Sequence, residues 1–148
     1  LTLALDAAGI ANKGVIMTPH LMAQIRDAQG NVVETYKPSI YKQSLSPSAA
    51  QQLTQLMQAV ATNGTAAGVG FGSALNVAVK TGTAQTGLTD SAHNTHDWMI
   101  GFAPANAPQL AVAVEVPYQA YSTSGAQVAG PITCRMLQGA LHLTGQCP

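Results

Sequence analysis

Two short stretches in which large apolar residues alternate with small or polar ones constrain the fold of this chain most strongly. They are residues 75–80 and 110–116, and residues 97–102 form a further apolar, aromatic-containing stretch between them. A period of two is the period of a half-buried β-strand. Only the proline-bounded segment 104–108 separates the last two stretches, and so short a link joins antiparallel neighbours. The sequence therefore predicts an antiparallel sheet, with a longer polar link over residues 85–96.

The segment from Ser46 to Asn63 is predicted to be a long helix. Ser46 is a favourable N-cap residue, and Pro47 stands at the first helical position, where its missing N–H costs nothing. Asn63 and Gly64 supply the stop. Apolar residues at helical spacing predict one buried stripe, formed by Leu53, Leu56, Met57 and Val60.

Two further helices and a small β unit complete the predicted elements. The first helix covers residues 1–12, and a hairpin around the turn 29–31 follows it. Gly130 and Pro131 are predicted to open a final helix that ends at Gly145. Its predicted buried stripe is Ile132, Met136, Leu137, Ala140 and Leu141. The expected fold class is α+β, an antiparallel sheet with helices packed on its faces.

The composition excludes several classes of protein. Hydrophobic residues make up 47% of the chain and charged residues only 8%, which favours a packed domain over disorder. The formal net charge is zero and the six Lys and Arg are scattered, so no nucleic acid partner is expected. No apolar run approaches the roughly 18 residues that span a bilayer. The chain starts at Leu1 already in helical spacing and without an initiator Met, so we expect further chain upstream.

The two cysteines, Cys134 and Cys147, leave two possibilities open. A disulfide between them would close a short C-terminal loop and contribute about 3 kcal/mol to stability in an oxidising compartment. The alternative is two free thiols, one on a helix and one in the tail.

The residues Lys80-Thr81-Gly82-Thr83, at the end of the first predicted main strand, carry the chemistry of the sequence. An ammonium at Lys80, in a stretch with little other charge, favours the loss of protons from nearby hydroxyls. Thr81 and Thr83 are two residues apart and point to the same side of a strand, where both can donate to one carboxylate. Gly82 has no side chain, so a ligand can approach the backbone, whose N–H groups can serve an oxyanion.

Lys-Thr-Gly is the third motif of the serine enzymes that recognise penicillin. Along nearly its whole length the chain resembles the transpeptidase domain of penicillin-binding proteins, and in particular class B enzymes of the actinobacterial penicillin-binding protein A type. The resemblance is carried by AAGIANKGVIMTPHL, LTQLMQAVATNGTA, VAVKTGTAQ, HDWMIGFAPA, LAVAVEV and GAQVAGPITCRMLQGAL. It implies that the chain is the C-terminal part of one transpeptidase domain, residues 1–148, with nucleophile and membrane anchor in a preceding part.

The resemblance also implies roles for individual residues. Lys80 would join the hydrogen-bond network that moves the proton of the nucleophile. Thr81 and Thr83 would bind the terminal carboxylate of the substrate or of a β-lactam, and Gly82 would lie between them in the substrate-binding strand. The backbone N–H of Thr83 would form half of the oxyanion hole. The implied substrate is a D-Ala-D-Ala stem peptide of peptidoglycan; no cofactor or metal is expected.

Other candidate sites are rejected on the sequence. No Ser-x-Asn occurs, and the one Ser-x-x-Lys, Ser39 to Lys42, lies too close before the Lys-Thr-Gly motif and is predicted to sit in a loop. His93 and His96 lack the spacing of a helical metal site. His96 and Asp97 are neighbours in a predicted strand, so their side chains point to opposite faces and do not form an acid/base pair.

Three functions remain open at this stage. The leading one is acyl transfer that cross-links peptidoglycan through a serine acyl-enzyme, carried out on the extracytoplasmic side of the bacterial membrane. A β-lactamase or D,D-carboxypeptidase of the same superfamily differs mainly in how water reaches the acyl-enzyme. A penicillin-binding sensor would keep the carboxylate pocket without turnover. This chain alone is expected to be inactive.

Overall fold

The computed structural model describes residues 1–147 and has the α+β class expected from the sequence. Its helices are α1 (Thr2–Ala11), α2 (Pro47–Thr62) and α3 (Gly125–Ala140), with a short 3-10 helix η1 (Ala67–Val69). Its strands are β1 (Val15–Met17), β2 (Gln24–Arg26), β3 (Val32–Thr35), β4 (Ile40–Gln43), β5 (Ala78–Gln85), β6 (Thr95–Ala103) and β7 (Leu110–Gln119). No helix within residues 1–147 is long and apolar enough to cross a membrane.

The main sheet has the strand order β5-β6-β7 and is antiparallel throughout, as the sequence predicts. The three predicted strands are all present, and the second and third are longer than predicted. The first was predicted over residues 75–80, and this is wrong at its start, since β5 begins at Ala78 and continues to Gln85. β5 forms one edge of the sheet, and its register pairs Gly82 with Trp98 and Thr83 with Asp97. The residues of the Lys-Thr-Gly motif therefore stand on a strand with one neighbour among the described residues.

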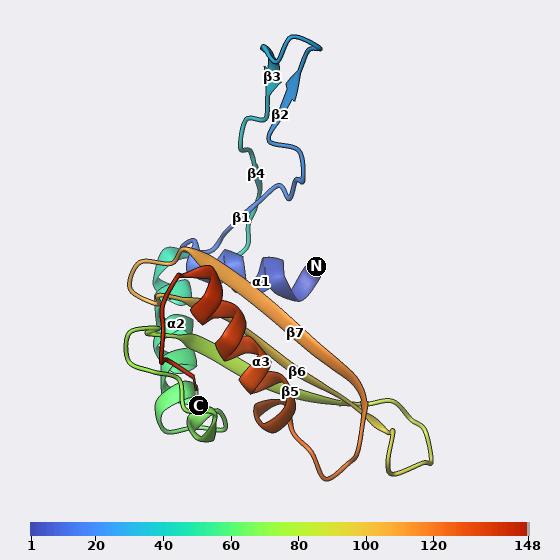
Figure 1. The fold of residues 1–148 in the computed structure, drawn as a ribbon. Coiled ribbons are helices and arrows are strands. Elements are labelled where there is room, and N and C mark those ends of the chain that lie inside the picture. Colours follow the sequence, from blue (N-terminus) through green and yellow to red (C-terminus); the bar gives the residue numbers. More distant parts are fainter. Residues whose placement is uncertain (148) are drawn as a thin grey trace.

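Helices cover both faces of the main sheet (Figure 1). On one face, Val79, Met99 and Val114 pack in one core with Cys134 and Leu137 of α3. The other face is covered by α1 and α2, and its core contains Ala78 and Phe102 of the sheet, Met57 of α2, and Ile10 and Ala11 of α1. Successive side chains of a strand point to opposite faces of the sheet, and this determines which residues face which helix.

The four short strands form an arm that projects from the body (Figure 1). β1 pairs with β4 at its base, and β2 pairs with β3 at its tip, where the hairpin around residues 29–31 was predicted. The segment 39–42 was predicted to be a loop, and this is wrong, since Ile40–Gln43 is the strand β4. β4 is exposed on both faces, so its sequence shows no alternation of burial that would identify it as a strand.

The helix α2 begins as predicted, with the Ser46 hydroxyl accepting a hydrogen bond from the Ala49 N–H at 3.2 Å. Its predicted stripe is partly wrong, because Leu56 is 64% exposed while Met57 is buried. Neighbouring residues of a helix differ by about 100° in direction, so only one of the two can face the sheet. The other buried residue of α2, about two turns before Met57, is the small Ala50.

The helix α3 differs more from its prediction. It begins at Gly125 rather than at Gly130, so Pro131 lies inside the helix, and it ends at Ala140 rather than at Gly145. The carbonyl of Ser124 accepts from the N–H groups of Gln127 and Val128, which starts the first turn without a proline. The buried face runs through Ala129, Thr133, Cys134 and Leu137, whereas Ile132 and Met136 of the predicted stripe are exposed. The buried face differs from the predicted stripe because small residues let α3 lie close to the sheet.

A disulfide joins Cys134 and Cys147, with Cα atoms 5.8 Å apart. Of the two states that the sequence leaves open, the structure has the bridged one. The bridge fixes the segment after α3 against that helix, and the N–H of Gly72 also donates to the Gln146 carbonyl.

Candidate active site

The Lys-Thr-Gly-Thr motif occupies the middle of the edge strand β5. Ala78 and Val79, just before it, are fully buried and fix the strand in the core. From Lys80 onward the strand leaves the core, and its side chains are exposed or half-buried. The sequence therefore places the chemistry-bearing residues where a buried strand becomes an exposed edge.

The residues of the motif divide between the two faces of β5. Thr81 and Thr83 share the face of Val79, which is covered by α3, and so point to the same side as predicted. Lys80 and Gly82 lie on the opposite face. Gly82 stands directly across from Trp98, and a Cβ atom there would lie 3.4 Å from the Trp98 Cβ.

The motif opens onto a cleft of about 520 Å³ between β5 and the beginning of α3. Lys80, Thr81, Gly82 and Thr83 line one side. The other lining residues are Ser124, Gly125, Ala126 and, from the loop after α2, Thr65. All four predicted site residues are therefore brought together in one cleft.

The ammonium of Lys80 is exposed and donates to the Thr81 carbonyl oxygen at 2.6 Å. Within residues 1–147 no carboxylate lies within ion-pair distance of it. An ammonium has three donors, so two remain for a ligand or for a neighbouring hydroxyl. This group is the positive charge that an anionic ligand in the cleft would meet.

The two threonine hydroxyls have different partners. The Thr81 hydroxyl lies 2.8 Å from that of Thr65, and either one can be the donor. The Thr83 hydroxyl donates to the Asp97 carboxyl at 2.9 Å and accepts from the Gly125 N–H at 3.4 Å. Sequence reasoning expected both hydroxyls to be available to one carboxylate, and in the structure both already have protein partners.

Sequence reasoning missed Thr65, Asp97, Thr123 and Gly125 as neighbours of the motif. The Thr123 hydroxyl donates to the second oxygen of the Asp97 carboxyl at 2.7 Å. The sequence does carry one indication, because Asp97 is the one charged residue of the predicted strand 97–102. It could be assigned to Thr83 only once the register between β5 and β6 is known.

The rejected candidates lie outside the cleft. Ser39 directly precedes β4 and Lys42 lies within that strand, both on the exposed arm. His93 pairs with Asp90 at 2.7 Å in the loop between β5 and β6. His96 pairs with a glutamate of β7, and among residues 1–147 no group of three or more potential ligands could hold a metal ion.

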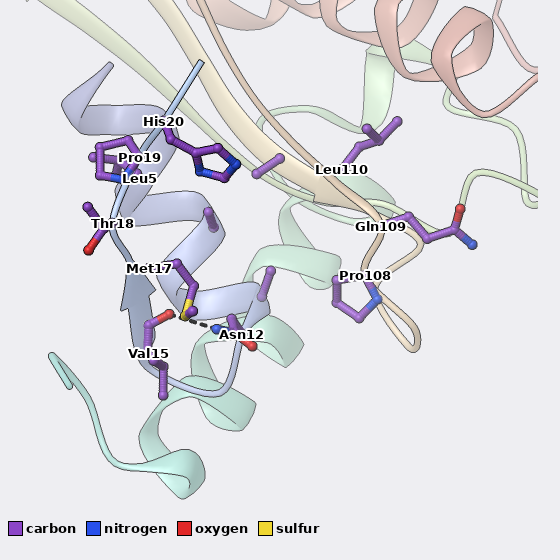
Figure 2. Close-up of a pocket in the computed structure, with 13 residues that line it drawn as sticks. Leu5, Asn12, Val15, Met17, Thr18, Pro19, His20, Pro108, Gln109 and Leu110 are labelled. Carbon is purple, nitrogen blue, oxygen red and sulfur yellow. Dashed lines mark hydrogen bonds between the residues drawn. The ribbon is translucent and has the colours of Figure 1, made fainter. Parts of the chain in front are cut away.

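A second hollow, of about 530 Å³, lies between α1, β1 and the start of β7. Figure 2 shows that apolar side chains such as Leu5, Met17 and Leu110 line it. His20 is the one titratable residue among those that line it. Unlike the cleft beside β5, this hollow brings together no lysine and hydroxyl groups of the Lys-Thr-Gly-Thr motif.

The fold and the cleft together define an α+β protein whose edge strand presents the third motif of the penicillin-recognising serine enzymes. The family model of the penicillin-binding protein transpeptidase domain matches residues 1–138. The chain therefore belongs to the penicillin-binding protein transpeptidase family, as the resemblance in the sequence implies.

Known relatives support this assignment. The chain is similar to the peptidoglycan D,D-transpeptidase PbpA of Mycobacterium tuberculosis, strain H37Rv, with 38% identity over 139 residues, 92% of this chain and 28% of the relative. PbpA of Mycolicibacterium smegmatis is 36% identical over 142 residues, again 92% of this chain and 28% of the relative. The chain thus spans under a third of the length of these relatives.

Solved structures agree with the sequence relatives. The ceftriaxone acyl-enzyme complex of penicillin-binding protein A from M. tuberculosis matches with a TM-score of 0.85 and 34% identity, over 93% of this chain and 31% of that chain. The penicillin G acyl-enzyme complex of the same protein matches with a TM-score of 0.79 and 35% identity, over 93% and 31%.

Proposed function

We propose that the intact protein containing this chain is a peptidoglycan D,D-transpeptidase that β-lactams inhibit. A serine attacks the carbonyl of the penultimate D-Ala of a stem peptide, and the terminal D-Ala leaves with a proton on its amine. The amine of a second stem then displaces the serine from the acyl-enzyme and forms the cross-link. The observation that carries the proposal is the exposed Lys80-Thr81-Gly82-Thr83 edge beside a cleft, in a chain of this family.

Each residue of the motif has a role that its placement suits. The Lys80 ammonium, without a carboxylate partner among the described residues, can stabilise the deprotonated nucleophile and pass on its proton. The hydroxyls of Thr81 and Thr83 and the charge of Lys80 provide a site for the terminal carboxylate. Gly82 leaves the backbone accessible, and the Thr83 N–H supplies half of an oxyanion hole.

The nucleophile and the other half of the oxyanion hole belong, in this proposal, to an upstream part of the same domain. This chain contains no Ser-x-Asn, and its one Ser-x-x-Lys is on the arm. The proposed partners are therefore that upstream part, the D-Ala-D-Ala stem peptide and β-lactams. The proposed place of action is the extracytoplasmic face of the membrane, with an N-terminal anchor. The Cys134–Cys147 disulfide is consistent with this proposal, because disulfides persist in oxidising compartments.

The test is to incubate the intact protein with benzylpenicillin and to record its mass. We expect one covalent penicillin on the wild-type protein and acylation at least about 100-fold slower in Lys80→Ala. Lys42→Ala is the matched control, because Lys42 is also exposed but lies on the arm, and it should acylate like the wild type. Ser39→Ala should do the same, and loss of the adduct in that variant would make Ser39 the nucleophile.

The other outcomes decide between the rival functions. A wild-type protein that forms no adduct and leaves the drug intact is not an acyl-transfer enzyme. An unmodified protein with hydrolysed drug points to a β-lactamase. Release of D-Ala from a stem peptide without a cross-linked product indicates a D,D-carboxypeptidase, and a stable adduct on a protein that never turns over a stem peptide indicates a sensor.

A further inference from the structure

Asp97 is a buried acidic residue on β6, the strand next to the motif strand β5. It lies on β6, opposite Thr83, and its exposed fraction is 0%. Among residues 1–147 no Lys, Arg or His lies within ion-pair distance of its carboxyl group. Burying a carboxyl group without a cation costs free energy that neutral donors offset only in part. The fold therefore carries a costly group at a position where an apolar residue would pack without that cost.

Both oxygens of the Asp97 carboxyl are used. Oδ1 accepts from the Thr83 hydroxyl at 2.9 Å. Oδ2 lies 2.7 Å from the Thr123 hydroxyl, whose one proton is shared with the Ala120 carbonyl oxygen at 2.8 Å. A hydroxyl has only one proton, so the Thr83 hydroxyl, with its proton toward Asp97 and the Gly125 N–H at 3.4 Å on its oxygen, is held in one orientation. The remaining lone pair of the Thr83 hydroxyl oxygen then keeps one direction relative to the cleft that Thr83 lines.

The two hydroxyls come from the two sides of the cleft. Thr83 belongs to β5, and Thr123 belongs to the segment that leads into α3, whose first residues Gly125 and Ala126 line the opposite side. Asp97 itself does not line the cleft. One buried carboxyl group is thus hydrogen-bonded both to β5 and to the segment that leads into α3.

We propose that Asp97 is a positioning residue of this site, holding the Thr83 side chain in one orientation and joining β5 to the start of α3 through Thr123. The functional part of this proposal rests on the proposed acyl transfer. The expected consequence is that Asp97 affects acylation through the Thr83 hydroxyl, beyond any effect on stability. Asp97→Asn keeps the shape but replaces one acceptor oxygen by an N–H₂ donor, so both hydroxyls can no longer donate to it.

The experiment is a double-mutant cycle in the intact protein, with the second-order rate constant of acylation by benzylpenicillin as the readout. Asp97→Asn should slow acylation about tenfold, which corresponds to about 1.4 kcal/mol. In a Thr83→Val background, where no hydroxyl is left to orient, the same change should alter the rate by less than about twofold. Effects of the two substitutions that simply multiply would overturn the proposal.

Thr95→Val is the matched control for the loss of a buried hydrogen bond on the same strand. Thr95 is fully buried on β6, two residues before Asp97, and its hydroxyl donates to the Gln119 carbonyl at 3.0 Å. We expect this variant to melt at a lower temperature and to acylate at the wild-type rate. Equal slowing in Thr95→Val and Asp97→Asn would mean that Asp97 acts only through stability, and the proposal fails.

A crystal structure of the intact Asp97→Asn protein provides a readout that needs no turnover. The Thr83 side chain should occupy more than one rotamer or turn away from position 97. A single unchanged rotamer of Thr83 would contradict the proposal. If the wild-type protein is not acylated at all, the proposed function fails, and this structure still decides whether Asp97 positions Thr83.

Discussion

Gly125, the first residue of α3, lies directly against the backbone of Gly82 in β5. A Cβ atom built on Gly125 would stand 2.6 Å from the Gly82 carbonyl oxygen, and it would also collide with the Trp98 carbonyl. Real side chains do not tolerate such distances to backbone atoms, so the helix can begin here only because position 125 has no side chain. This close approach sets the width of the cleft beside the motif.

We therefore expect Gly125→Ala to push the first turn of α3 away from the sheet. Overpacking of this kind costs about 1–3 kcal/mol, so thermal unfolding of the intact protein should shift to lower temperature. Acylation by benzylpenicillin should also slow, because Ser124 and Ala126 move with the helix.

The control for this prediction is Gly139→Ala in the same helix. A Cβ atom on Gly139 meets nothing within 4 Å, so the added methyl group should be neutral or stabilise the helix by up to about 1 kcal/mol. Gly125→Ala and Gly139→Ala proteins with the same melting temperature and the same acylation rate would show that the close approach to Gly82 is unimportant.

The contact between Thr65 and Thr81 leads to a second prediction. The two hydroxyls lie 2.8 Å apart at the edge of the cleft, so Thr65→Val removes the partner that orients the Thr81 hydroxyl. A hydrogen bond between neutral groups is worth about 0.5–1.5 kcal/mol, so acylation should slow about twofold to tenfold. Thr62→Val is the control, since the exposed Thr62 hydroxyl bonds only to carbonyls within α2. An unchanged rate in Thr65→Val would exclude this role of Thr65.

The sheet could be predicted from the sequence because its causes are local. Alternation within residues 110–116 and the short link 104–108 require a hairpin, whatever packs on it. The start of α2 at Ser46 and Pro47 is local in the same sense, since an N-cap depends on neighbouring residues. These predictions are confirmed.

The faces of the helices could not be predicted, because they depend on what each helix packs against. Leu56 and Met57 are equally apolar neighbours in sequence, and only the sheet decides that Met57 is buried. In α3, the small residues Gly130 and Ala129 are buried against the sheet, while the larger Met136 is 51% exposed. A periodicity argument counts large apolar residues and therefore misses a face built from small ones.

The neighbours of the motif were missed for another reason. Thr83 and Asp97 are brought together by the register of β5 and β6, which the long link between the strands leaves undetermined in the sequence. The motif residues themselves were found, since Lys80-Thr81-Gly82-Thr83 is contiguous. Their catalytic roles remain predictions, to be tested with the intact protein.

The hairpin tip of the arm should be sensitive to pH. The pKa of Asp27 is lowered by hydrogen bonds from the Asn31 side chain and from backbone N–H groups of residues 29–31. A lowered folded-state pKa means that the stabilisation is present above the usual aspartate range, about 4, and is lost as the pH falls through the folded pKa. Asn31→Ala should raise the pKa of Asp27 in an NMR titration; an unchanged pKa would exclude Asn31 as its main cause.

The disulfide gives the last prediction. Cys134 and Cys147 are 13 residues apart, and a loop of this size stabilises a protein by about 3 kcal/mol in the chain-entropy model. Reduction of the intact protein should therefore lower the urea midpoint of the transition that includes α3. Cys147→Ser is the better variant, because Cys134 is fully buried and its replacement would also disturb the core. This variant should have the stability of the reduced protein and should not respond to reductant. If reduction leaves the midpoint of the wild type unchanged, the bridge does not hold the C-terminal segment against α3.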